Sequence, residues 1–337
     1  MKKLIIVLLL YCSTSIAGEV NIFSARHYDS DLDLYNKFTE ETGIKINVVS
    51  GDDKALQKRI TEEDKDCVGD LYITSDAGRL GELESKEILQ KINWSEEIKN
   101  KVPKNFRSDA WVGIAKRARI LFYSPERVTE YEIQNLSYED LADPRWKGRI
   151  VIRQSDNIYN QSLIASLIEN NGKDKTLKWA KSIVNNMARS PKGNDRAQIL
   201  AVAAGEADLA VANTYYYALM LSGQKGEEQK IAAKKVTPYF PNQNNRGTHM
   251  NISGVGILKF SPNKSNAIKL IEFLLSKEAQ DHIVNNTFEY PMIENVLPNE
   301  LVPGKDLNFK QDNSTDVKLY WDKQSEALKI MLLAGWK

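Results

Sequence analysis

Short apolar runs alternate with amphipathic segments through the first third of the chain, and this alternation limits the fold more than any other feature. Each strand-like run is followed by a segment whose apolar residues have helical spacing. The resulting β-α-β-α-β order predicts a parallel sheet covered by helices on both faces. Ligands of such sheets bind in the loops at the carboxyl ends of the strands. The expected strands are 19–24, 45–49 and 70–74, and the expected helices are 31–42, 54–63 and 77–88.

The run WVGIAKRARILFY at 111–123 predicts a second α/β domain. It has no turn signal and is too long for one small sheet, so we expect it to cross between two domains. Two domains joined by crossover strands form a hinged pair with a ligand cleft between them. The second unit should contain strands 149–153 and 208–212 and helices 136–142, 160–169, 175–187 and 197–204. Segment 235–240 is expected to be a second crossover, followed by a return to the first sheet at 253–258, a helix at 266–275 and a final helix at 317–333.

This order gives explicit domain boundaries. The first α/β domain is expected to comprise residues 18–115 together with about 239–302. The second is expected to comprise residues 116–238 together with about 303–337. A mature chain of this length exceeds one comfortable hydrophobic core, which agrees with two domains.

The first seventeen residues have the pattern of a cleavable Sec signal peptide. Two lysines precede an apolar core at 4–10, and Ser15-Ile16-Ala17 forms a small-x-small cleavage site. This core is too short for a stable membrane anchor. The sequence LLLYC lacks the small residues expected before a lipidated cysteine, so attachment of lipid to Cys12 is disfavoured. We therefore expect an exported, periplasmic protein.

Charge and cysteine content exclude several classes of protein. Removal of the leader takes away two of the 46 basic residues and none of the 45 acidic ones. This near-neutral balance argues against nucleic acid or an anionic membrane as a partner. Cys67 would be the single remaining cysteine, so the mature fold has no internal disulfide.

Sequence motifs of catalysis are also missing. The chain has no HExxH, CxxC, P-loop or GxSxG motif, and its histidines, His27, His249 and His282, are scattered. Acid pairs such as Glu40-Glu41 lie on helix faces expected to be exposed. We therefore predict that the protein is not an enzyme.

Tyrosines are concentrated where the strand-to-helix loops should lie. The groups are ARHYD at 25–29, DNIYNQ at 156–161 and NTYYY at 213–217, each directly after an expected strand. Phenols stay protonated near neutral pH because their pKa is about 10. A highly charged cation such as Fe³⁺ displaces that proton and binds the phenolate. Tyr215 and Tyr216 would lie in a first helical turn, where unpaired N–H groups favour anions, whereas Tyr217 should pack.

Structural explanations compete with this metal site. Tyrosines in such loops often pack as half-buried aromatics or stack on an organic ligand, and a tyrosine triplet alone is more often structural. His27 would ordinarily be an exposed histidine, although its imidazole is also a ligand for iron. The basic run from Lys116 to Arg119 is either a solvated cluster or the source of an arginine that balances negative charge. Four phenolates around one Fe³⁺ sum to −1.

The tyrosine motifs give the chain a resemblance to a known family. It resembles the extracytoplasmic ferric-iron-binding proteins of ABC importers, in particular their Fut-type branch, over nearly all of the mature chain. The resemblance implies a type II periplasmic-binding-protein fold that holds Fe³⁺ as transported ligand and uses no catalytic cofactor. It also implies an importer permease and ATPase as partners for a monomeric protein. The segments that carry it are SARHYDSD, KRARILFYS, LADPRWKGRIVIR, NIYNQSLIAS, GEADLAVANTYYY and PNQNNRGTHMNISGVGI.

Matching these motifs residue by residue implies a ligand set. Tyr28 would come from the first domain and Tyr159, Tyr215 and Tyr216 from the second, with His27 as an additional ligand whose use varies in the family. Arg119 would be the nearby cation that balances the tyrosinates, in preference to Arg26 and Lys116. The chain lacks the His-Glu arrangement of the better-known ferric-binding branch. It also lacks the arginine that some members place one turn past the tyrosine pair, because residues 218–220 read Ala-Leu-Met.

Three other functions are alternatives to iron binding or additions to it. A protein of the same fold for an organic or anionic solute, such as a polyamine, thiamine or a phosphonate, would use the tyrosines for stacking or hydrogen bonding. A periplasmic hydrolase or transferase would need a base paired with a nucleophile, and the sequence shows no such pair. An interaction module for a sensor is compatible with the sequence as an additional role.

Overall fold

A computed structural model describes residues 18–26 and 28–337, and its strands and helices between residues 19 and 85 follow the predicted order. Strand β1 (Glu19–Ser24) pairs in parallel with β2 (Lys45–Ser50) and with β3 (Leu71–Thr74). Helix α1 (Asp31–Thr42) buries Leu34, Tyr35 and Phe38 and ends at Gly43, whose φ of 71° a residue with a Cβ rarely adopts. The helices α2 (Asp53–Glu63) and α3 (Ala77–Ser85) follow β2 and β3.

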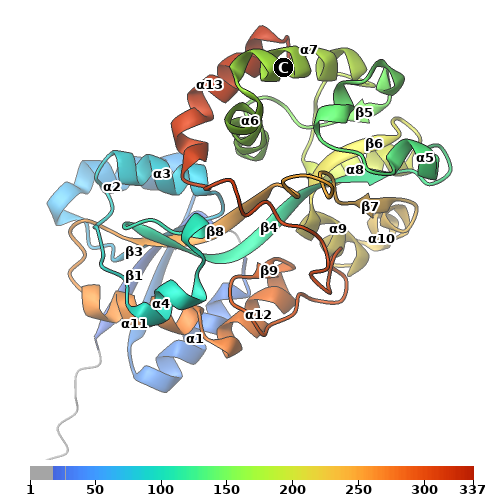
Figure 1. Cartoon of the computed structure of the whole chain (residues 1–337). Coiled ribbons are helices and arrows are strands. Elements are labelled where there is room, and N and C mark those ends of the chain that lie inside the picture. Colours follow the sequence, from blue (N-terminus) through green and yellow to red (C-terminus); the bar gives the residue numbers. More distant parts are fainter. Residues whose placement is uncertain (1–17, 27) are drawn as a thin grey trace, which may run out of the picture.

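The long strand β4 (Trp111–Tyr123) joins the two halves, as Figure 1 shows. Its first part pairs antiparallel with β8 (Met250–Ile257), and its last five residues pair antiparallel with β6 (Leu209–Asn213). Because β8 also pairs with β3, the strands are continuous in the order β2-β1-β3-β8-β4-β6-β5. The predicted crossover at 111–123 is confirmed, because residues 111–118 pair with β8 and residues 119–123 pair with β6.

Glycine at two positions of β8 permits close packing on this crossover. A Cβ added to Gly254 would lie 2.9 Å from the carbonyl oxygen of Val112 and 2.6 Å from Leu80 Cδ1 of α3. A Cβ on Gly256 would meet the Ala110 carbonyl oxygen at 3.0 Å. The sequence SGVG therefore lets β8 lie between β3 and β4 in the sheet while packing closely against α3.

The second half surrounds β5 (Ile150–Val151) and β6, which are parallel. Segment 235–240 does not cross between the halves, contrary to expectation, because β7 (Thr237–Tyr239) pairs with Leu121–Tyr123 at the far end of β4. The return to the first sheet is made by the loop after β7 and by β8. The helices of this half are α5 (Glu130–Ile133), α6 (Ile158–Asn171), α7 (Lys173–Asn186), α8 (Asp195–Ala203), α9 (Thr214–Leu221) and α10 (Glu227–Ala233).

The C-terminal helix α13 (Leu319–Leu333) contacts both halves. It packs on α6 and α7 of the second half and on α3 of the first, where Figure 1 shows it in red. The domain boundaries near 239 and 303 stay predictions. The other elements are α4 (Glu96–Lys101), α11 (Lys264–Leu274), α12 (Lys277–Thr287), β9 (Tyr290–Pro291) and 3-10 turns at 64–66, 104–106, 139–142 and 144–146. Among the described residues, none of the helices combines the length and the apolar character needed to cross a membrane.

Candidate metal centre

Tyr215 and Tyr216 lie side by side in the first turn of α9, directly after the buried strand β6. Their ring centroids are 4.2 Å apart with an interplanar angle of 33°. Asn213 occupies the N-cap position but makes no side-chain cap bond, because its side-chain oxygen accepts from Arg119 Nη1 at 3.0 Å. Tyr217 packs away from this pair, as expected: its ring lies 5.1 Å from that of Phe122.

Tyr159 joins this pair from the first turn of α6. Asn157 caps that helix by accepting a hydrogen bond from the amide of Asn160, which fixes the turn that carries Tyr159. The Tyr215 hydroxyl donates to the Tyr159 hydroxyl over 3.4 Å. Two loops of the second half therefore bring their phenol oxygens to one place.

Tyr28 approaches the same place from the first half. It follows β1 in the loop before α1, and the Arg26 guanidinium lies 4.7 Å from its ring centroid. In addition to burial, the charge of Tyr159 raises the pKa of Tyr28, and the charges of Tyr159 and Tyr28 raise the pKa of Tyr215. Tyr28 therefore lies within electrostatic reach of both residues. His27, the remaining predicted ligand, lies outside the described residues.

Burial favours the protonated form of Tyr28, Tyr215 and Tyr216. It raises the pKa of Tyr28 and of Tyr215 well above the usual value near 10, and raises that of Tyr216 as well. Mutual repulsion among phenolates adds to this effect, since ionising one tyrosine disfavours ionising its neighbour. A cluster of this kind ionises readily only when a cation replaces the protons.

Two arginines border the tyrosines, and one carboxylate holds both. The Arg117 guanidinium lies 5.7 Å from the Tyr159 ring centroid and 5.8 Å from that of Tyr215. Glu289, fully buried, lies 3.1 Å from Arg117 Nη2 and 2.8 Å from Arg26 Nη1. Arg26 also pairs with Asp31 at 2.9 Å. Glu289 was not identified from the sequence, where it is a lone acid between Phe288 and Tyr290.

Arg119 lies two residues after Arg117 on β4 and supports the loops that carry the tyrosines. It donates to Asn160 Oδ1 at 2.7 Å and pairs with Asp195 at 3.1 Å, in addition to its bond to Asn213. Asp195 is shared with Arg153, at 3.5 Å, and the Arg153 guanidinium lies 5.9 Å from the Tyr159 ring centroid. The assignment of Arg119 as the balancing cation stays a prediction, and Arg117 is the basic residue of β4 that lies against the tyrosine rings.

A metal site of the more familiar donor type is missing from the part of the chain that the structure describes. Residues 18–26 and 28–337 contain no group of three or more His, Cys, Asp or Glu side chains able to hold a metal ion. The phenol cluster offers oxygen donors of a different kind to a cation.

Comparison with known proteins identifies the group to which this chain is related. Residues 68–316 match the bacterial extracellular solute-binding proteins. The chain is 46% identical over 321 residues to iron uptake protein A1 of Synechocystis sp., covering 95% of this chain and 88% of that protein. The chain belongs to the bacterial extracellular solute-binding protein family.

Solved structures similar to this chain have the same architecture. The Trichodesmium protein IdiA (FutA), in complex with iron and citrate ligands, superposes with a TM-score of 0.90 and 46% identity over 95% of this chain and all of that one. The ferric binding protein from Campylobacter jejuni gives a TM-score of 0.86 at 37% identity, covering 94% of this chain and all of that one. The predicted two-domain type II periplasmic-binding-protein fold is therefore confirmed for this solute-binding protein.

Proposed function

We propose that this solute-binding protein captures Fe³⁺ outside the cytoplasmic membrane and delivers it to an ABC importer. The observation that carries this proposal is the convergence of phenols from three loops beside buried arginines. Tyr28, Tyr159, Tyr215 and Tyr216 supply the ligands, with His27 as an additional one. Relatives named iron uptake protein and Fe(3+)-binding periplasmic protein support the choice of cargo.

The charges around the cluster support a tyrosinate site. Arg26 and Arg117 are balanced by Glu289 and Asp31, so this group is neutral overall. Arg119 and Arg153 share the single carboxylate of Asp195, which leaves one positive charge. Four phenolates and Fe³⁺ together carry −1. The second group therefore supplies the one positive charge that balances the metal complex.

Iron capture would proceed in two steps. Fe³⁺ first meets the tyrosines of the second half, which already lie together, and closure about β4 and β8 then brings Tyr28 onto the metal. Only the closed, loaded form should dock productively with the permease and its ATPase, so the domain motion reports loading. The protein acts as a monomer, is exported by a signal peptide at 1–17 and catalyses no reaction in this role.

The test is a visible absorption titration of the mature protein with chelated Fe³⁺. Wild type should develop the red-orange charge-transfer band of iron-phenolate, and the Tyr215→Phe/Tyr216→Phe double variant should lose it. Tyr217→Phe is the matched control, because that neighbouring ring packs on Phe122 and its hydroxyl donates to the Val236 carbonyl.

Two results would overturn the proposal. One is a wild-type protein that takes up no iron and stays colourless, which would redirect the search to an organic or anionic solute. The other is a double variant that keeps the band at full intensity, since phenylalanine retains the ring and removes only the oxygen.

A further inference from the structure

A large cavity lies on the face of β4 that is turned away from the tyrosines. Its volume is about 710 Å³, and we call it the rear pocket. Successive side chains of a strand point to opposite faces, so Lys116 faces this pocket while Arg117 faces Tyr159 and Tyr215. The walls come from both sides of the crossover: residues 100–106 from the first half, and residues 291–297 and 307–314 after β9.

Lys116 enters the rear pocket with weak polar support. Its ammonium donates to Gln311 Oε1 over 3.5 Å and lies 5.8 Å from the ring centroid of Phe106. Within the described part of the chain, no carboxylate oxygen comes within 4.0 Å of it. Burial lowers the pKa of the Lys116 amine to about 8, and the charge of Glu294 opposes that shift only partly. A negatively charged ligand would compensate this ammonium.

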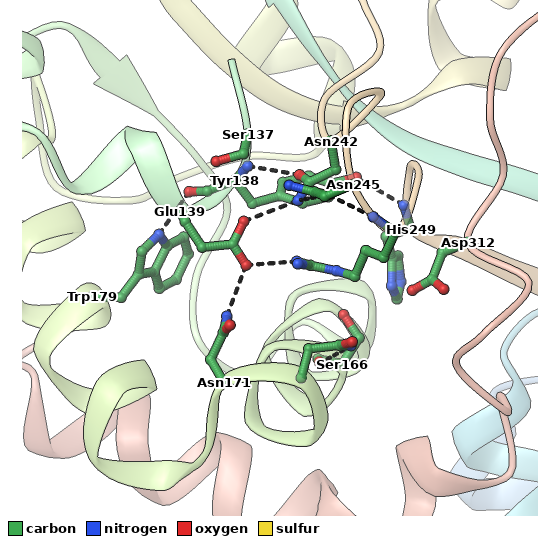
Figure 2. A network of polar contacts seen from close by, with 12 residues as sticks. Ser137, Tyr138, Glu139, Ser166, Asn171, Trp179, Asn242, Asn245, His249 and Asp312 are labelled. Atoms are coloured by element: carbon green, nitrogen blue, oxygen red, sulfur yellow. Dashed lines mark hydrogen bonds and ion pairs between the residues drawn. The ribbon is translucent and has the colours of Figure 1, made fainter. Parts of the chain in front are cut away.

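The other basic residues of the pocket wall are already engaged. Arg246 pairs with Glu139 at 2.8 Å, and Glu139 also accepts hydrogen bonds from Asn171 and Asn242, as Figure 2 shows. Lys101 pairs with Glu97 at 2.6 Å. Lys310 donates to the carbonyl oxygen of Asn245. Lys116 is therefore the least engaged cation of the pocket wall: among the described residues its ammonium has a single 3.5 Å contact with Gln311, whereas Lys310 is exposed and donates to a carbonyl oxygen.

The remaining walls indicate what kind of anion fits. Phe106, Met292, Leu307 and Phe309 give the pocket an apolar surface, which favours a ligand with a hydrocarbon body. Glu294 lies on the wall as well and would repel a second negative charge. A single carboxylate on an organic body meets both conditions.

We propose that the rear pocket is a second binding site, for a small organic monocarboxylate whose carboxylate contacts the Lys116 ammonium. Its apolar body packs against Phe106 and Phe309. This site shares no residue with the tyrosine cluster, so the inference stands whether or not the cluster binds iron.

Benzoate is the probe for the test, in calorimetric titrations of the iron-free mature protein. We expect one benzoate to bind per chain, and Lys116→Gln to weaken binding by about tenfold or more, as expected for loss of a charged hydrogen bond. Lys181→Gln is the matched control, because Lys181 is exposed on α7 and does not line the pocket. Asn313→Trp, at an exposed wall position, should block binding by filling the space without disturbing the core.

Two further titrations separate this site from the iron cleft and define its ligand class. The Tyr215→Phe/Tyr216→Phe variant should bind benzoate as wild type does, and inorganic phosphate should bind far more weakly than benzoate. Absence of benzoate binding, or equal affinity in Lys116→Gln and Lys181→Gln, would overturn the site. Loss of benzoate binding in the tyrosine variant would place the ligand in the cleft instead, and phosphate binding as tight as benzoate would overturn the organic assignment.

Discussion

At the scale of single residues, the chemistry depends on protons. Burial holds Tyr28, Tyr215 and Tyr216 in the neutral form, so each phenol that binds Fe³⁺ must release a proton. The tyrosines themselves were predictable from the sequence because they directly follow strands in an α/β order. Glu289 was not, because the arginines that it holds come from segments far from it in the sequence and meet it only in the folded chain.

Iron affinity should rise steeply with pH. Protons compete with the metal for phenolate, so acidification favours the free protein, and the apparent binding constant should fall by about tenfold per pH unit for each proton released. Competition with a ferric chelator of known affinity, from about pH 6 to pH 8, measures this slope. The single variant Tyr216→Phe, which removes one phenol, should flatten the slope and Tyr217→Phe should not; an affinity independent of pH would contradict phenolate ligation.

Glu289→Gln should destabilise the fold strongly. Glu289 is completely buried and binds two buried guanidinium groups, so removing its charge leaves positive charge uncompensated in a low-dielectric site. Breaking a buried pair in this way costs about 3 kcal/mol of the free energy of unfolding. Urea denaturation measures the change. Glu97→Gln is the control, since the Glu97 side chain is 63% exposed and pairs with Lys101, so its loss should lower the free energy of unfolding by less than about 1 kcal/mol. Equal losses of unfolding free energy in the two variants would contradict a stabilising role for the buried charge of Glu289.

At the scale of elements, the sequence predicted the helices and strands whose apolar residues recur with a strong local period. Helix 31–42 and strand 111–123 have the predicted bounds because their apolar pattern and end signals agree. Two elements differ because tertiary pairing decides them: the helix expected at 136–142 is a 3-10 turn at 139–142, and segment 235–240 pairs with the end of β4. Helix α12 was not predicted, since much of KEAQDHIVNNT is polar and only the cap at Ser276 marks its start.

The capping box of α5 should stabilise the protein in a pH-dependent way. Hydrogen bonds from the Thr129 backbone, followed by those from Arg149, lower the pKa of Glu132 to about 2. A carboxyl with a depressed pKa in the folded state stabilises that state above its unfolded pKa, and this contribution is lost as pH falls through the folded value. Glu132→Gln should therefore cost about 1 kcal/mol at neutral pH, and the difference should shrink between about pH 5 and pH 2.

Denaturant unfolding of both proteins across this range tests the capping box. Glu130→Gln serves as the control, because Glu130 lies in the same first turn but is exposed and makes no cap bond. A difference between wild type and Glu132→Gln that stays constant with pH would show that the carboxylate charge is not the source of the stabilisation.

At the scale of the whole molecule, one side-chain contact links the two halves beside the tyrosine cluster. Asp76, at the N-cap of α3, accepts hydrogen bonds from Ser162 Oγ of α6 at 3.1 and 3.3 Å and from Asn251 Nδ2 of β8 at 2.8 Å. Ser162 lies one turn after Tyr159 on the same helix. The contact therefore joins the first half directly to the helix that carries one of the proposed ligands.

Ser162→Ala should loosen the closed arrangement and speed the loss of iron. Removing a buried hydroxyl that pairs with a carboxylate lowers the stability of the closed state relative to the open state by about 1 kcal/mol or more. This difference corresponds to roughly fivefold faster transfer of Fe³⁺ to an excess of chelator. Ser166→Ala provides a matched control: Ser166 is equally buried on α6, but its hydroxyl donates to the Leu163 carbonyl within the helix. Decay of the charge-transfer band after chelator addition gives both rates. If the two variants released iron equally fast, the Asp76–Ser162 contact would contribute nothing to closure, and the hinge strands and the metal alone would set the release rate.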